Sequence, residues 1–217
     1  MIVIESKRKK PATILKKYPG AILADVTSSA KDGLVKLSPF YPHGGIPVPF
    51  TEGMTASCVE AIWQGLKVFE HCDVDTSLFT NTTMRGLKRT VRRFGRPLGH
   101  RKGVHGTELL GYIEARKLIY IPTYRWVLEN KVQAIIDRLR EASKSKAKTI
   151  ILLDYDTNAD VENAAKPLSH ASLIKAYVEG LYPYGDKVAQ DLQEPKELNL
   201  FDESTLKSQD SLFYQEF

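Results

Sequence analysis

The clearest strand in this chain reads Lys148-Thr149-Ile150-Ile151-Leu152-Leu153-Asp154, a short apolar run that stops abruptly at a carboxylate. Such a run is typical of a strand that is buried on both faces. Ligands of open α/β sheets collect at the carboxyl ends of the strands. Asp154 is therefore a candidate catalytic residue at the edge of a small sheet.

Further strands and helices are expected in the rest of the chain. Two further strands are expected at 1–4 and 21–26, and the Pro- and Gly-dense stretch 37–50 is expected to be an ordered loop. Helices are expected at 11–18, 57–69, 83–94, 107–117, 122–142 and 169–180, with a break at Pro122. The pattern predicts an α+β or α/β fold, a single mainly helical domain around a small sheet over residues 1–185. An acidic, lightly structured tail is expected over 186–217.

Composition limits the possible classes of protein. The chain has 217 residues, of which 42% are hydrophobic and 26% charged, so one sizeable core is expected. No apolar stretch approaches the ~20 residues that cross a bilayer, and we expect no contact with a membrane. Two cysteines do not suggest a disulfide framework, and the apolar start precedes its charges, unlike a signal peptide. A cytoplasmic location is expected.

A polar stripe marks the predicted helix Ser57–Phe69. Its apolar residues recur at helical spacing, while Glu60, Gln64 and Lys67 would share an arc of about 60°. A helix that is apolar almost all round is normally buried, so these polar groups would face a pocket or a partner. An ordinary solvated stripe beside the core is the other interpretation that the spacing allows.

The spacing Ser57-x-x-Glu60-x-x-x-Gln64-x-x-Lys67-x-Phe69, preceded by Leu37-Ser38-Pro39-Phe40-Tyr41-Pro42, resembles the NADAR (YbiA-like) family. The resemblance covers most of residues 34–162. It implies a NADAR-like fold and an N-glycosidase that splits a base or an amine from ribose C1′. The family has a Trp-Gly pair where this chain has Val161-Glu162-Asn163, so the chain looks like a divergent branch.

The resemblance implies roles for several side chains. Lys67 would attack C1′ and hold the opened sugar as a Schiff base, Glu60 would handle protons, and Gln64 would orient the substrate. Asp160 is the counterpart of an acidic residue that follows the closing strand of the family. A second carboxylate is expected from Asp154, Asp160 or their neighbours. Neither a metal nor a cofactor is expected.

A basic segment separates Asp75 from Glu108, an interval without acidic residues. At helical spacing its cations would form a ridge suited to a phosphate backbone. Nucleic acid, with DNA favoured, is therefore the expected partner. The expected function is a DNA glycosylase that releases a modified base, and antiviral defence is a natural setting for it. The expected nucleic-acid-binding residues are Arg85, Lys88, Arg89, Arg92, Arg93, Arg96, Arg101 and Lys102.

Two alternatives remain open from the sequence. One is an N-glycosidase that acts on small nucleotides or ADP-ribosylated guanine, and the other is a non-catalytic module that binds nucleic acid or ADP-ribose. Aromatic side chains could stack a base in any of these cases. The expected substrate-binding residues, besides Gln64, are Phe40, Tyr41, Trp63, Asn158 and His170.

Overall fold

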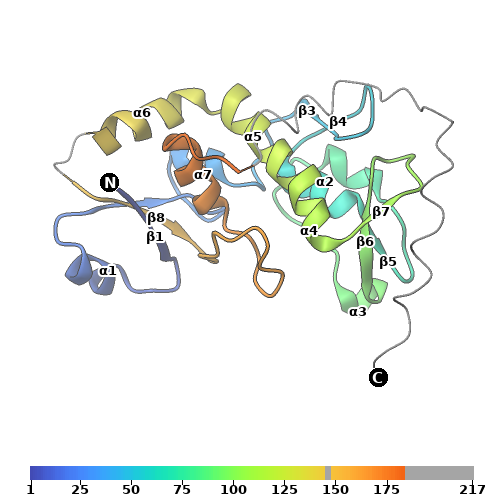
Figure 1. The fold of residues 1–217 in the computed structure, drawn as a ribbon, viewed down its shortest axis with the longest axis horizontal. Helices are drawn as coiled ribbons and strands as arrows, with labels where there is room; N and C mark the ends of the chain where they lie inside the picture. Colours follow the sequence, from blue (N-terminus) through green and yellow to red (C-terminus); the bar gives the residue numbers. More distant parts are fainter. Residues whose placement is uncertain (145–147, 184–217) are drawn as a thin grey trace, which may run out of the picture.

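A three-stranded parallel sheet with β8 at its centre forms one end of the molecule (Figure 1). The structure, a computed structural model, describes residues 1–144 and 148–183, and the expected acidic tail over 186–217 lies outside them. Ile150 pairs with Ile2 on one side and with Ile22 on the other. All three expected strands are present, and every residue of β8 is buried, as its apolar run predicted. The sheet consists of β1 (Ile2–Ser6), β2 (Ile22–Asp25) and β8 (Ile150–Asp154).

Helices cover both faces of this sheet (Figure 1). Side chains alternate along β8, so Ile151 and Leu153 meet Ile14 of α1 (Pro11–Lys17) on one face. The other face joins the main core, against which α7 (His170–Val178) packs, with α6 (Gln133–Lys144) beside it. The mixed α/β fold that the sequence predicted is confirmed.

The other end of the molecule holds α2 and a three-stranded antiparallel sheet in the order β5-β6-β7 (Figure 1). Short turns and a two-stranded β3–β4 ladder connect these elements. The bounds are η1 (Gly33–Leu37), β3 (Ile46–Pro47), β4 (Thr55–Ala56), α2 (Val59–Gly65), β5 (Lys67–Phe69), η2 (Thr76–Thr80), α3 (Val91–Phe94), β6 (Pro97–Arg101) and β7 (Leu109–Leu110).

One long helical segment joins the two ends, and the predicted break at Pro122 is wrong. The segment runs through α4 (Tyr112–Ala115), the π-helical turn η3 (Arg116–Tyr120) and α5 (Ile121–Asn130). The amide of Ile121 donates to the carbonyl of Arg116, five residues back. This wider turn lets the chain continue past a proline, which has no N–H to donate. The break falls instead between α5 and α6.

Three other predicted helices are shorter than expected. The helix predicted over 107–117 begins only at Tyr112, because Leu109–Leu110 pairs with β6 as strand β7. The helix predicted over 57–69 ends at Gly65, because Lys67–Phe69 pairs with β6 as a strand. The basic helix predicted over 83–94 is limited to α3. Met84 and Gly86 have positive φ values of 59° and 69°, which lie outside the right-handed helical region.

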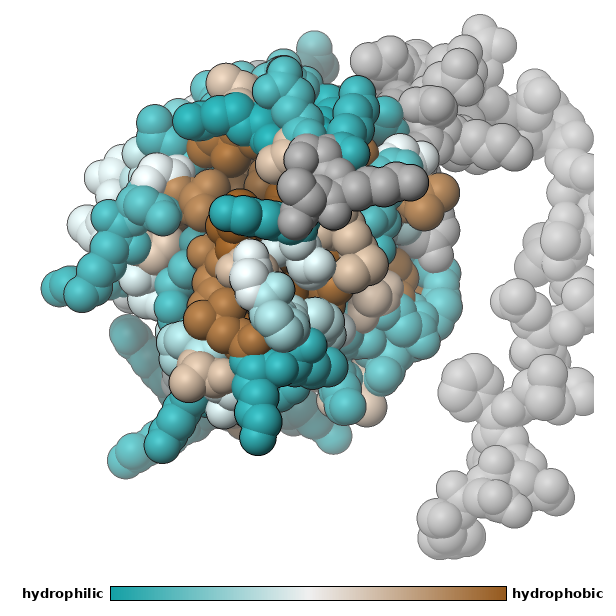
Figure 2. Space-filling model, turned by 90° about the vertical axis from the view of Figure 1, so that its left-hand side faces the viewer, coloured by the Kyte–Doolittle hydropathy of each residue, from teal (hydrophilic) through white to brown (hydrophobic). Residues whose placement is uncertain are grey.

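Figure 2 shows the sheet end of the molecule from outside, where patches of apolar surface alternate with hydrophilic side chains. Such interrupted apolar surface is normal for a folded protein. Within residues 1–144 and 148–183, none of the helices has the length and hydrophobicity that crossing a membrane requires.

Candidate functional site

A pocket of about 510 Å³ lies where the carboxyl ends of the parallel strands meet α2 and β5. Residues from both ends of the molecule therefore line it. The predicted site residues that it brings together are Phe40, Glu60, Trp63, Gln64, Lys67, Lys88, Arg89, Asp154 and His170. Pockets of this size commonly accept nucleotide-sized ligands.

The two sequence blocks that carry the family resemblance contact each other in this pocket. The backbone N–H of Glu60 donates to the carbonyl of Pro39 at 2.9 Å, which joins the 37–42 loop to the start of α2. The hydroxyl of Tyr124 donates to the carbonyl of Leu37 and anchors the same loop from α5. The loop thus forms one wall of the pocket and presents Phe40 to it.

Glu60 is buried and is held by its neighbour on the next helical turn. The side-chain amide of Gln64 donates to Oε1 of Glu60 at 2.9 Å, and Oε1 of Gln64 accepts from the backbone N–H of Arg89 at 3.2 Å. Burial raises the pKa of Glu60, although the Gln64 hydrogen bond and the charges of Lys88 and Lys67 oppose this shift. The Glu60 carboxyl is therefore suited to carry a proton and to donate it.

Lys67 lies on β5 rather than on α2, yet its side chain still reaches the pocket. Burial lowers the pKa of Lys67, the charge of Glu60 opposes this shift, and the charge of Arg89 adds to it. Its Nζ lies 5.9 Å from the centre of the Trp63 ring and has no hydrogen-bond partner within residues 1–144 and 148–183. An amine with a lowered pKa and no partner is suited to act as a nucleophile.

Aromatic rings form the wall behind Lys67. Trp63 packs against Tyr120 and Tyr112, with ring centres 5.6 and 5.9 Å away. On its other side it contacts the buried His100 at 3.8 Å. Burial raises the pKa of the Tyr120 hydroxyl well above its usual range, and the charges of Glu60 and Asp154 add to this, so the phenol stays protonated.

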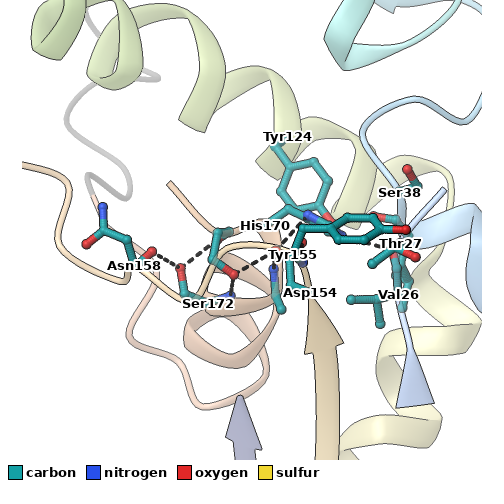
Figure 3. A network of polar contacts seen from close by, with 12 residues as sticks. Val26, Thr27, Ser38, Tyr124, Asp154, Tyr155, Asn158, His170 and Ser172 are labelled. Carbon is teal, nitrogen blue, oxygen red and sulfur yellow. Dashed lines mark hydrogen bonds and ion pairs between the residues drawn. The ribbon is translucent and has the colours of Figure 1, made fainter. Parts of the chain in front are cut away.

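Asp154 and His170 form a buried pair in the lining of the pocket, and Figure 3 shows the polar network around them. Oδ2 of Asp154 lies 3.0 Å from Nδ1 of His170 and accepts from the hydroxyl of Ser169 at 2.7 Å. Burial alone would raise the pKa of Asp154, but the His170 interaction and the Ser169 hydrogen bond lower it below its usual value. Nε2 of His170 lies 2.9 Å from the carbonyl of Val26, so the pair ties together the ends of β8, β2 and α7.

The Asp154 oxygens are thus already occupied by protein donors, since Oδ1 also accepts from the N–H of Tyr155 at 2.7 Å. This arrangement favours a positioning role for Asp154 over proton transfer. The predicted substrate contact His170 is likewise engaged at both ring nitrogens.

Three of the predicted catalytic and substrate-binding residues do not line the pocket. Asp160 accepts from the N–H of Glu162, and Asn158 donates to the carbonyls of Asp160 and Lys166, so both organise their own loop. Tyr41 packs its ring against His43. The contacts of Asp160 and Asn158 are typical of turns, in which short polar side chains bond to the nearby backbone.

The eight predicted nucleic-acid-binding residues do not form a helical ridge. Arg89 is buried, and Arg96, Arg101 and Lys102 pair with Glu70, Asp73 and Glu108 respectively. Four of the eight are exposed without an ion pair in the described part of the chain: Arg85, Lys88, Arg92 and Arg93. Only Lys88 and Arg89 line the pocket.

Several pocket residues were not predicted from the sequence. Arg8 follows β1 and donates to the carbonyl of Tyr155 at 2.8 Å, which places it at the pocket rim beside Thr27. Arg116, only 2% exposed, donates to the carbonyls of Val161, Asn163 and Lys166 and to the Tyr112 hydroxyl. The sequence could have predicted Arg8, because it lies two residues after the end of β1, and ligands collect at the carboxyl ends of parallel strands.

Comparison with known proteins identifies one family. No curated protein and no solved structure matches the chain significantly. A family described as a family of unknown function (DUF6939) matches residues 6–174. This range includes every predicted catalytic residue and all but the last turn of α7. The chain therefore belongs to this family of unknown function.

Proposed function

We propose that the protein is an N-glycosidase that cleaves the bond between a base and a sugar in a nucleotide-type substrate. The observation that carries the proposal is the pairing of Glu60 and Lys67 in one pocket with opposite pKa shifts. Both shifts favour the uncharged forms, a carboxylic acid and an amine. Two titratable groups whose environments change their pKa values in this way are suited to acid and nucleophile roles.

The reaction follows from these two groups. The bond from C1′ to the base breaks, and its electron pair leaves with the base nitrogen, which takes the proton of Glu60. The Nζ of Lys67 bonds to C1′ and returns a proton to the Glu60 carboxylate. The bond from C1′ to O4′ then breaks, O4′ takes the proton back from Glu60, and the lone pair of Nζ forms the C1′=N bond of a protonated Schiff base. Water hydrolyses this Schiff base to release the sugar and the amine. The resemblance to the NADAR family, carried by the 37–42 and 57–69 blocks, supports the same reaction.

A small phosphorylated nucleotide, including an ADP-ribosyl adduct, is the substrate that the pocket fits best. Its aromatic wall offers Trp63 and Phe40 for stacking a base. At the rim, the exposed Arg8 and Lys88 have no carboxylate partner in the part of the chain that the structure describes. A substrate phosphate could therefore bind to these two side chains.

A base extruded from DNA is the second candidate, favoured by the exposed Arg85, Arg92 and Arg93 of the segment that also supplies Lys88 to the pocket. Because the helical ridge is not formed, these cations would contact few phosphates. A shallow dependence of binding on salt is then expected even for DNA.

Base release measured by mass spectrometry tests the proposal. Wild-type protein is incubated with modified and unmodified DNA, RNA, NAD and ADP-ribosylated nucleosides, and Lys67→Ala is the matched variant. We expect release of a base by the wild type, with Lys67→Ala losing release but retaining binding. Borohydride should trap a protein–sugar adduct only when Lys67 is present. Binding without release on every substrate would instead favour a non-catalytic module.

A further inference from the structure

We propose that Arg89 is the residue that prepares Lys67 for attack: its buried guanidinium holds the β5 backbone in place, and its positive charge acts against the charged form of the Lys67 amine. This inference rests on the nucleophile role proposed for Lys67. Arg89 comes from the segment that the sequence assigned to a nucleic-acid-binding ridge, and the fold gives it a different position.

The guanidinium of Arg89 connects three separate parts of the backbone. Its Nη1 donates to the carbonyls of Gln64 at 3.2 Å and Lys67 at 2.6 Å, and its Nη2 donates to the carbonyl of Asp73 at 2.8 Å. The end of α2, the start of β5 and the following loop are therefore joined by one side chain. Since Lys67 itself is one of the three, Arg89 fixes the point from which the lysine side chain extends.

Arg89 is a buried charge with no carboxylate partner within residues 1–144 and 148–183. Its acceptors are backbone carbonyls, and its Nε has no partner in the described part of the chain. The carboxylate of Asp73 is engaged by Arg101 at 2.7 Å and is largely exposed. Arg89 contributes to lowering the pKa of Asp73, so this carboxylate compensates part of its charge without an ion pair. The remaining positive charge acts on a cation that lies nearby.

That cation is Lys67. The rings of Phe69 and Phe94 lie 4.9 and 5.0 Å from Cζ of Arg89, and Nζ of Lys67 lies 5.7 Å from the same Phe69 ring. The two cationic groups thus contact the same aromatic ring, and like charges that share a partly buried site repel each other. An uncharged amine relieves this repulsion.

Two other titratable groups face Lys67. Glu60 favours the charged lysine, but burial raises its own pKa, which weakens that effect. His100 pairs with Lys67 across the β5–β6 ladder, and burial is the largest cause that lowers its pKa to about 3. His100 is therefore neutral at physiological pH. Burial is the largest cause that lowers the pKa of Lys67, the charge of Glu60 opposes it, and Arg89 is the charged group that adds to the lowering.

The test measures the titration of Lys67 directly, independently of any substrate. In protein labelled with ¹³C at the lysine Cε, the Lys67 signal is assigned by its loss in Lys67→Arg and followed against pH. We expect the wild-type Lys67 to titrate at lower pH than the exposed lysines, and Arg89→Met to move its midpoint to higher pH. Arg89→Lys, which keeps the charge, should leave the midpoint close to that of the wild type.

The matched control is Arg138→Met, which removes an exposed arginine from α6 and should leave the Lys67 midpoint unchanged. An unchanged midpoint in Arg89→Met would overturn the proposal, as would equal shifts in Arg89→Met and Arg89→Lys. If Arg89→Met does not fold, the wild type still tests the proposal: a Lys67 midpoint equal to that of the exposed lysines would overturn it. Absence of base release would refute the proposed function but would leave this titration intact.

If base release is observed, the pH–rate profile provides a second readout. Arg89→Met should lose most activity at neutral pH and recover it at higher pH, where the lysine loses its proton. A loss of activity that is the same at every pH would point to a purely structural role and would refute the electrostatic part of the proposal.

Discussion

Arg116 supports one wall of the candidate site, and its replacement by methionine gives a quantitative test of the structure. Arg116 is 2% exposed and donates hydrogen bonds to four acceptors, three of which are carbonyls of the 161–166 loop. The loop leads into Pro167 and Leu168, which line the pocket. Methionine has a similar length and apolar character but no donors, so the substitution removes the hydrogen bonds with little change in volume.

The expected loss of stability follows from the fate of each acceptor. Asn163 and Lys166 are partly or fully exposed, so water can replace Arg116 at their carbonyls, whereas Val161 is buried. Leaving one buried carbonyl unsatisfied costs about 1–3 kcal/mol, and the lost bonds from a charged donor contribute about 1.5–3 kcal/mol more. We expect Arg116→Met to lower the free energy of unfolding by about 3–5 kcal/mol.

Urea denaturation measures the loss, and hydrogen exchange locates it. Amides of residues 156–168 should exchange faster in Arg116→Met, while those of β8 should change only in proportion to global stability. The control Arg138→Met, at an exposed arginine of α6, should change stability by less than about 0.5 kcal/mol. A loss below about 1 kcal/mol in Arg116→Met, with unchanged exchange in the loop, would refute the reasoning.

Three further predictions concern single residues. Hydrogen bonds from two lysines lower the pKa of Glu5 from 4.5 to about 2, so its contribution to stability is present above pH 4.5 and is lost as the pH falls toward 2. Acid unfolding curves should therefore show that Glu5→Gln loses about 1 kcal/mol less stability over this pH range than the wild type, a small difference because the lysines are exposed. Gly103→Ala should destabilise the fold, measured as a lower thermal midpoint, because a Cβ would lie 2.3 Å from the carbonyl oxygen of Phe50 and φ is +80°. Asp154→Asn should lower the free energy of unfolding, measured in urea, by about 3 kcal/mol, because an amide replaces the buried carboxylate that contacts His170 and Ser169. An unchanged urea midpoint would contradict the pairing of Asp154 with His170.

The residues of α2 show what local sequence can predict. The apolar spacing placed Glu60 and Gln64 on one face of a buried helix, and the structure has them hydrogen-bonded one turn apart. The same spacing predicted a helix as far as Phe69, which is wrong. Residues 67–69 pair with β6, and the periodicity of a local segment contains no information about a strand that is distant in sequence. Lys67 nevertheless lies in the pocket, since the chain turns into β5 directly after the helix.

Arg89 shows the opposite case. Its sequence neighbours are basic and polar, and charge patterning alone assigned it to an exposed ridge. In the structure Leu87 and Arg89 are both buried, an alternation typical of extended chain, and the exposed cations lie between and beyond them. Whether a charged side chain faces solvent depends on which backbone carbonyls lie within its reach, and those belong to residues 16–25 positions away.

Local sequence alone determined the buried strand that ends at Asp154, the polar face of α2 and the mixed α/β class, because each depends on the periodicity of neighbouring side chains. Only the tertiary structure decided which polar groups share the pocket. It placed Arg8, Tyr120 and Arg116 beside Glu60 and Lys67, and it excluded Asp160 and Asn158. The reason is physical: a pocket is made by contacts between residues distant in sequence, and the burial that shifts the pKa values of Glu60 and Lys67 exists only once those contacts have formed.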